Sequence, residues 1–277
     1  MAQFILGARL HDYGKGTPDE LFGRVAADGF AAVQLAYKKC IPGVKSYDDV
    51  TPQLVADTVA AGRKHNIQVA VLGTYVELAI DDEERRLANA ADFKSQLAVC
   101  KALNAGCIGT ETTNMALQPA GTTRERAQYL LCKSLEMILP EAERLGVTVA
   151  IEPVSYHSMN TPEATRRILD TMASPALKVI FDAGNLLTAD AVQKQDALWE
   201  RVGALLGDRI VAVHFKGETF GPDGAHHSSS LEDSVIDFDS AFRMLRTLPQ
   251  TLPVLREEAV PERAASDIAL IRRYFEA

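Results

Sequence analysis

Short apolar segments recur along the chain, and each is followed by a stretch whose apolar residues have helical spacing. The segments begin about 28 to 42 residues apart. They cover residues 4–8, 32–36, 67–72, 107–110, 147–151, 177–181, 210–213 and 252–255. Strands that alternate with helices at this interval are typical of βαβ units in a parallel sheet. Several segments are continuous apolar runs, which indicates strands buried on both faces.

The starts of three helical stretches are marked by a threonine followed by a proline. The pairs are Thr17-Pro18, Thr51-Pro52 and Thr161-Pro162. A threonine hydroxyl caps the free N–H groups of the first turn, and proline fits the first helical position because it has no N–H to satisfy. These pairs therefore predict helix starts near residues 18, 52 and 162.

Eight strands with seven or eight helices in 277 residues predict a TIM barrel, a closed (β/α)8 fold with a parallel eight-stranded sheet. We expect one domain over residues 1–277, because no linker or low-complexity tract divides the chain. An open doubly wound sheet is the alternative, but residues 7–16 do not match its GxGxxG turn. The polar stretch Phe220–Ser230 follows the seventh strand, so we expect a loop that covers the C-terminal face.

The balance of charges limits the partners that we expect. The chain has 29 Lys and Arg against 37 Asp and Glu, a formal net charge of −8. Phosphate contacts need a basic face, so we expect no nucleic-acid partner. Neither a signal peptide nor an apolar stretch of about 18 residues is visible. We therefore expect a cytoplasmic protein with no membrane partner, and the sequence leaves open whether it forms a homo-oligomer.

Chemically active side chains stand at the ends of four consecutive predicted strands. The fifth strand ends at Glu152, the sixth at Asp182, the seventh at His214 and the eighth at Glu257 or Glu258. Active sites of (β/α)8 barrels lie at this end of the strands. Burying such groups is costly unless they are paired or bind a cation. Four of them in register therefore predict a metal site rather than isolated salt bridges at the rim.

The alternation of side chains along each strand tests these assignments. In the fifth, sixth and seventh strands, a lumen-facing final residue leaves the large apolar residues on the helix side, as a barrel requires. The eighth strand is less clear. With Glu257 inward, Arg256 faces the helices, whereas Glu258 inward would place Arg256 in the lumen. We prefer Glu257 and keep Glu258 as the alternative.

Three carboxylates and one imidazole make an oxygen-rich ligand set. Such a set favours Mn²⁺, Mg²⁺ or Co²⁺, and Zn²⁺ also fits, although structural Zn²⁺ prefers Cys and His. His11, Asn185 and Lys216 stand at the ends of the first, sixth and seventh strands, where we expect them to bind substrate. Glu111, at the end of the fourth strand, is either a further substrate contact or part of a rim salt bridge.

At these residues the chain resembles the xylose isomerase-like TIM barrel superfamily, and in particular its sugar phosphate isomerase/epimerase group. The resemblance spans essentially the whole chain through short motifs in a fixed order. The motifs are Leu10-His11-Asp12, Gly109-Thr110-Glu111, Ile151-Glu152-Pro153, Phe181-Asp182-Ala183-Gly184-Asn185, Val213-His214-Phe215-Lys216 and Val254-Leu255-Arg256-Glu257.

The resemblance implies a divalent cation held by four residues, two of which also move protons. The implied ligands are Glu152, Asp182, His214 and Glu257, and the two glutamates would act on opposite faces of the substrate. The chain departs from many members at Asn185, where they carry His, at Gly217, where they carry Asp, and over residues 226–230, where they are Gly-rich. These are substrate-contact positions, so the departures bear on the identity of the substrate.

The predicted function is a divalent-metal-dependent isomerase or epimerase of a sugar or sugar phosphate. Glu152 and Glu257 would serve as general base and general acid around a cis-enediolate. A metal-dependent dehydratase or lyase of a cyclitol or keto-sugar is the alternative, because it would use a similar site. An endonuclease IV-like phosphodiesterase is less consistent with the chain, which has six histidines and no basic stripe.

Overall fold

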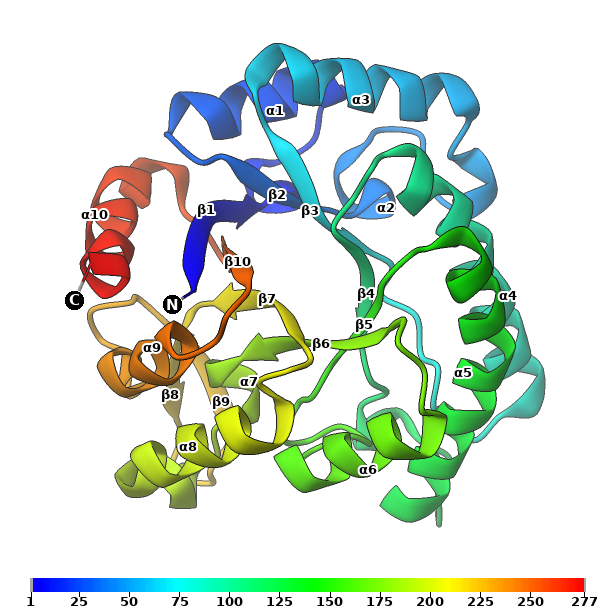
Figure 1. Cartoon of the computed structure of the whole chain (residues 1–277), viewed down its shortest axis with the longest axis vertical. Coiled ribbons are helices and arrows are strands. Elements are labelled where there is room, and N and C mark those ends of the chain that lie inside the picture. Colours follow the sequence, from blue (N-terminus) through cyan, green and yellow to red (C-terminus); the bar gives the residue numbers. More distant parts are fainter. Residues whose placement is uncertain (1, 277) are drawn as a thin grey trace.

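The computed structural model describes residues 2–276, and its centre is a closed barrel of eight parallel strands (Figure 1). The order of strands around the barrel is β1-β10-β7-β6-β5-β4-β3-β2. The predicted TIM barrel is therefore confirmed. The strands are β1 (Gln3–Arg9), β2 (Ala32–Leu35), β3 (Gln68–Gly73), β4 (Cys107–Glu111), β5 (Val149–Glu152), β6 (Leu177–Asp182), β7 (Ile210–Phe215) and β10 (Thr251–Arg256).

Helices form a ring outside the barrel (Figure 1). The hydroxyls of Thr17, Thr51 and Thr161 accept hydrogen bonds from the first turns of α1, α3 and α6, as the sequence predicted. Within residues 2–276, no helix is both long and apolar enough to cross a bilayer. The longer helices are α1 (Pro18–Ala27), α3 (Pro52–His65), α4 (Glu83–Ala102), α5 (Arg124–Leu145), α6 (Pro162–Met172), α8 (Gln195–Leu206), α9 (Phe238–Arg246) and α10 (Ala264–Glu276).

Two separate apolar cores follow from the alternation of side chains along the strands. The larger core lies between the strands and the surrounding helices and includes Val179 and Phe181 of β6. The smaller cluster includes Ala150, Ile180, Ala212 and Leu255, the residues two positions before the predicted site residues. Since side chains alternate along a strand, this smaller cluster fills the barrel lumen beneath the site. Its many alanines keep the lumen narrow.

The stretch Phe220–Ser230, which we expected to be a loop, is largely a β-hairpin. Strand β8 (Gly217–Phe220) pairs antiparallel with β9 (His226–Ser229). Residues 221–225 form the connecting turn, and Gly224 has a φ of 78°, which glycine adopts without strain. The polar residues of β9 concealed the strand, because they lack the apolar alternation that reveals most strands.

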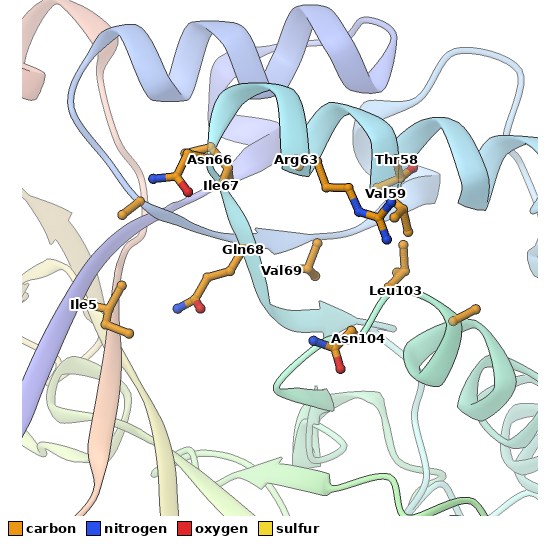
Figure 2. Close-up of a pocket in the computed structure, with 13 residues that line it drawn as sticks. Ile5, Thr58, Val59, Arg63, Asn66, Ile67, Gln68, Val69, Leu103 and Asn104 are labelled. Atoms are coloured by element: carbon orange, nitrogen blue, oxygen red, sulfur yellow. The ribbon is translucent and has the colours of Figure 1, made fainter.

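A pocket at the opposite, N-terminal end of the barrel is lined by the starts of strands and the ends of helices. Figure 2 shows Asn66 and Ile67, which follow α3, beside Gln68 and Val69 of β3, with Asn104 beyond the end of α4. All of its lining residues are described, and Arg63 is the charged one among them. Active sites of this fold lie at the other, C-terminal end of the strands.

The organisation of residues 1–277 as one domain stays a prediction, and limited proteolysis tests it. The first cut should fall in the hairpin turn at residues 221–225, because exposed turns are cut before packed strands and helices. The two fragments should remain associated, since β7 on one side of the cut pairs with β10 on the other. Two fragments of similar size that each fold alone would contradict a single domain.

Candidate active site

Every second residue of the barrel strands points into the lumen. The last lumen-facing residues of the different strands meet at the C-terminal mouth of the barrel. The residue after β10 continues the pattern, because the N–H of Glu257 donates to the carbonyl of Phe215 on β7 at 3.0 Å. Polar and charged side chains therefore gather at one end of a narrow, apolar lumen. These side chains are Arg9, Gln34, Glu111, Glu152, Asp182, His214 and Glu257.

His214 lies at the centre of a buried acidic cluster. Its Nδ1 atom is 2.9 Å from Oε2 of Glu152 and 3.4 Å from Oε1 of Glu257. One ligand atom from each of Glu152, Asp182 and His214 lies within 4.8 Å of the other two. All four side chains are at most 4% exposed. The structure thus brings together the four residues that the strand ends predicted.

Several polar atoms in this cluster have unused bonding capacity. Oδ2 of Asp182 and both ring nitrogens of His214 make no hydrogen bond within residues 2–276. The short contact between His214 and Glu152 lacks hydrogen-bond geometry. Buried polar atoms of native proteins are almost always satisfied. A divalent cation would satisfy them, and this mixture of carboxylate and imidazole suits Mn²⁺, Mg²⁺ or Co²⁺.

Cationic and amide groups surround the carboxylates. Asn185 donates from Nδ2 to Oε1 of Glu152 at 2.5 Å and accepts from Nζ of Lys216 at 2.6 Å. Nζ of Lys216 is also 3.5 Å from Oδ2 of Asp182. On the other side, Nη1 of Arg9 is 3.5 Å from Oε2 of Glu257. Glu152 therefore accepts a hydrogen bond from an amide, while Asp182 and Glu257 each lie beside a positive charge.

These neighbours change the protonation of the cluster. Burial lowers the pKa of His214, but Glu257 and then Glu152 outweigh burial and raise the pKa to about 9. Burial raises the pKa of Asp182. Burial also acts to raise the pKa of Glu257, but the positive charges of His214, Arg9 and Lys216 outweigh it and lower the pKa overall. The protein thus holds Glu257 as a carboxylate.

The eighth barrel strand directs Glu257, and not Glu258, into the lumen. Glu257 is two residues after Leu255, which belongs to the lumen cluster, and it is 4% exposed. Arg256 points to the helix side, where its Nε bonds Oδ2 of Asp267 on α10 at 2.7 Å. Its Nη1 also donates to the backbone carbonyl of Glu257. Glu258 has a φ of 56°, so the chain turns sharply just after Glu257.

The remaining predicted substrate residues lie around the same mouth. His11 lies in the 3-10 helix η1 (Leu10–Tyr13). Its ring packs edge-to-face against the ring of Tyr75, with 5.9 Å between the ring centroids. Burial, Arg9 and Lys39 lower the pKa of His11 to about 4. Glu111 lines a small cavity that also contacts the central cluster. Its Oε2 is also 3.9 Å from Nε2 of His157. Glu111 is thus placed both to reach a substrate and to contact an imidazole at the rim.

Four residues at this mouth, Arg9, Gln34, Tyr75 and His157, lie outside the set of site residues that the sequence predicted. Arg9 is the last residue of β1 and Gln34 is the last but one of β2, and both follow the same alternation, so the rule that found the other site residues applies to them as well. Tyr75 has a left-handed φ of 52°, and its hydroxyl accepts a hydrogen bond from Nε2 of Gln34 at 2.8 Å. His157 lies in the loop after β5 and has no local sequence signal.

The buried pair of Arg256 and Asp267 provides a stability test for the end of β10. Asp267→Asn should lower the free energy of unfolding by about 3 to 5 kcal/mol, because it leaves the buried guanidinium without its counter-charge. Urea denaturation measures the loss. Asp196→Asn is the matched control, since its partner Arg243 and Asp196 itself are exposed, and it should have little effect. Equal small losses in both variants would contradict this role of the buried pair.

Comparisons with known proteins agree with this architecture. A search of curated proteins finds no match. Among solved structures, 3-keto-D-glucoside 4-epimerase from E. coli has a TM-score of 0.74 and 18% identity, with 98% of this chain and 100% of that chain covered. A D-psicose 3-epimerase in the presence of D-fructose has a TM-score of 0.76 and 15% identity, with 99% and 100% covered. At identities this low, these TM-scores show a shared fold and no more.

A third structure and a family profile complete the comparison. A xylose isomerase-like TIM barrel protein from Mycobacterium smegmatis, in complex with magnesium, has a TM-score of 0.73 and 14% identity, with 99% of this chain and 98% of that chain covered. The profile described as xylose isomerase-like TIM barrel matches residues 22–274. The chain therefore belongs to the xylose isomerase-like TIM barrel family.

Proposed function

We propose that this protein is a divalent-metal-dependent isomerase or epimerase of a sugar or sugar phosphate. The observation that carries the proposal is the placement of Glu152 and Glu257 at 2.9 and 3.4 Å from the same nitrogen of His214. The two carboxylates come from strands that are not neighbours in the barrel, so they approach the mouth from different directions. Proton transfer on two sides of a substrate requires two separate carboxylates.

The ligands of the metal would be Glu152, Asp182, His214 and Glu257. The unsatisfied buried atoms of Asp182 and His214 support this assignment, as does a solved structure of a similar barrel protein in complex with magnesium. A bound divalent ion would supply Lewis acidity, which favours negative charge on neighbouring substrate oxygens. The lumen beneath is filled with small apolar side chains, so water has little access from below.

The two glutamates would perform the proton transfers. One carboxylate removes a proton from the carbon next to the substrate carbonyl, which gives a cis-enediolate. The other glutamate returns a proton, either to the neighbouring carbon in an isomerase or to the opposite face in an epimerase. Glu257 is held ionised by nearby positive charges, as a base must be. Asn185 orients Glu152 through its amide hydrogen bond.

Four further residues would bind the substrate. Lys216 can donate to an oxygen that gains negative charge, because its ammonium lies beside the cluster. His11 is neutral at pH 7, since its pKa is lowered to about 4, and its buried Nδ1 has no partner within residues 2–276. Glu111 and Asn185 would contact substrate hydroxyls. The solved relatives include an epimerase of a 3-keto-D-glucoside and one of D-psicose, which supports a sugar substrate.

Solvent-exchange measurements with glutamine variants test the proton transfers. Glutamine keeps the shape of glutamate but cannot accept the proton, so Glu152→Gln and Glu257→Gln should each lower kcat by roughly a hundred- to ten-thousand-fold. The measurement follows deuterium incorporation from D₂O into ketoses and ketose phosphates in the presence of Mn²⁺, Mg²⁺ or Co²⁺. The variant that keeps the base facing the substrate should still exchange its proton without forming product.

Glu258→Gln is the matched control for these variants, because it changes the adjacent carboxylate. It should leave turnover near normal. Full activity in both Glu152→Gln and Glu257→Gln would contradict the two-carboxylate mechanism. Loss of water from the substrate, in place of rearrangement, would favour the dehydratase or lyase alternative.

Metal affinity tests the ligand assignment separately from catalysis. Asp182→Asn and His214→Ala should each weaken Mn²⁺ binding roughly ten- to a hundred-fold or more, since each removes or neutralises a ligand while the barrel stays folded. Isothermal titration of the metal-free protein measures the affinity. His227→Ala is the control, because His227 is exposed on the hairpin. Unchanged affinity in both ligand variants would refute the assignment.

A further inference from the structure

A second cavity adjoins the mouth of the barrel on the side of the hairpin. Its volume is about 540 Å³, within the range of pockets that bind small molecules. Three segments form its walls: the loop after β5 with Ser155 and Tyr156, Thr188 after α7 (Ala183–Leu186), and residues 223–226 of the hairpin. Of these residues, His226 belongs to the stretch 226–230 that the resemblance marks as substrate-contact positions, and the others were not among the predicted site residues.

The floor of this cavity is built around an exposed aromatic ring. Tyr156 is 41% exposed, although two histidines support its ring. The ring centroid of His157 lies 4.8 Å from that of Tyr156, and the centroid of His226 lies 5.1 Å away, both in edge-to-face arrangements. The backbone is also held, because the carbonyl of Tyr156 accepts from the N–H of Met115 at 3.2 Å. The ring is therefore presented to solvent in a fixed orientation.

The hairpin wall is tied to the loop after β5. Nε2 of His226 shares a hydrogen bond with Oγ of Ser155 at 3.0 Å. Nδ1 of His226 lies 3.5 Å from Oε1 of Glu218, a carboxylate that is 4% exposed. The ring of Phe220 packs edge-on against His226 at 4.9 Å between centroids. These contacts hold the wall of the cavity in place before any ligand binds, which reduces the entropy lost on binding.

The cavity and the proposed catalytic centre share one segment of chain. Ser155 follows Glu152 by three residues, so their Cα atoms are at most about 11 Å apart. The N–H of Ser155 donates to the carbonyl of Asn185 at 2.8 Å, and the side chain of Asn185 bonds Glu152. On the lumen side, His157 is within 3.9 Å of Glu111. A ligand of two linked rings could therefore occupy both places.

The chemistry of the walls matches a sugar ring. An exposed aromatic face packs against the C–H groups of a pyranose or furanose, while its hydroxyls need hydrogen-bonding partners at the edge. Here those partners are the hydroxyls of Ser155 and Thr188, the carboxylate of Asp223 and the imidazole of His226. A phosphate group would find no lysine or arginine among the residues that line this cavity, all of which are described.

From this geometry we infer that the cavity is a second sugar subsite, and that the substrate is a glycoside whose reacting ring carries another sugar unit. The inference deepens the proposed function and rests on it for the position of the reacting ring. The attached sugar would stack on Tyr156 while the reacting ring lies at Glu152 and Glu257. Free monosaccharides would leave the second subsite empty and bind more weakly.

Binding measurements with ketose disaccharides test the subsite without relying on turnover. The probes are lactulose, turanose and isomaltulose, with D-fructose as the single-ring reference. Titration calorimetry of the Mn²⁺-loaded protein should show at least one disaccharide bound about five- to ten-fold more tightly than D-fructose. Tyr156→Ala should abolish that advantage and leave D-fructose affinity within two-fold, because it removes only the stacking face.

Tyr129→Ala is the matched control, since Tyr129 is another exposed tyrosine, on the surface of α5. It should change neither affinity. Equal binding of disaccharides and D-fructose by the unmodified protein, or an advantage that survives in Tyr156→Ala, would overturn the subsite. Deuterium exchange with free ketoses would still support the proposed function in that case. Conversely, Tyr156-dependent binding with no exchange in any bound sugar would support the subsite and contradict the proposed function.

Discussion

The burial of three carboxylates around one imidazole is the constraint on which the rest of this structure depends. Glu152, Asp182 and Glu257 are each at most 4% exposed, and their mutual repulsion in a poorly solvated lumen is costly. The protein offsets part of this cost with positive charge from Lys216 and Arg9, and with the raised pKa of His214. A bound divalent cation would offset the remainder. Buried charge on this scale is retained where it serves chemistry.

The barrel strands and the side chains that anchor their ends hold this cluster in place. An eight-stranded barrel has an interior just wide enough for side chains to fill, so the strand ends meet around one point above lumen residues such as Ala150 and Ala212. Arg256, turned away from the lumen, ties the end of β10 to Asp267 of α10. Asp12 ties the end of β1 to the segment after β10, because its carboxylate accepts hydrogen bonds from Nε of Arg9 and from the backbone N–H of Ala259. Positions on rigid strands hold the proton-transfer groups more accurately than mobile loops would.

The fold and the centre of the site were predictable because both follow from alternation along strands. The apolar segments marked all eight barrel strands, and their last residues identified Glu152, Asp182 and His214. The same rule applied to Leu255 decides between Glu257 and Glu258, because the lumen cluster includes Leu255. The rest depends on tertiary contacts without a local pattern. The pairing of β8 with β9 involves polar residues that show no apolar alternation. The edge-to-face contact of His226 with Tyr156 joins residues 70 positions apart in the sequence, which no periodicity connects.

In the proposed mechanism, four barrel strands together supply one metal site whose glutamates also face the substrate. Anomalous diffraction from crystals grown with Mn²⁺ tests it most directly, because the signal locates the ion independently of any assay. We expect one strong peak at the C-terminal mouth, with Glu152, Asp182, His214 and Glu257 all as ligands. A peak elsewhere with none at this cluster, or a peak there that excludes both glutamates, would contradict it.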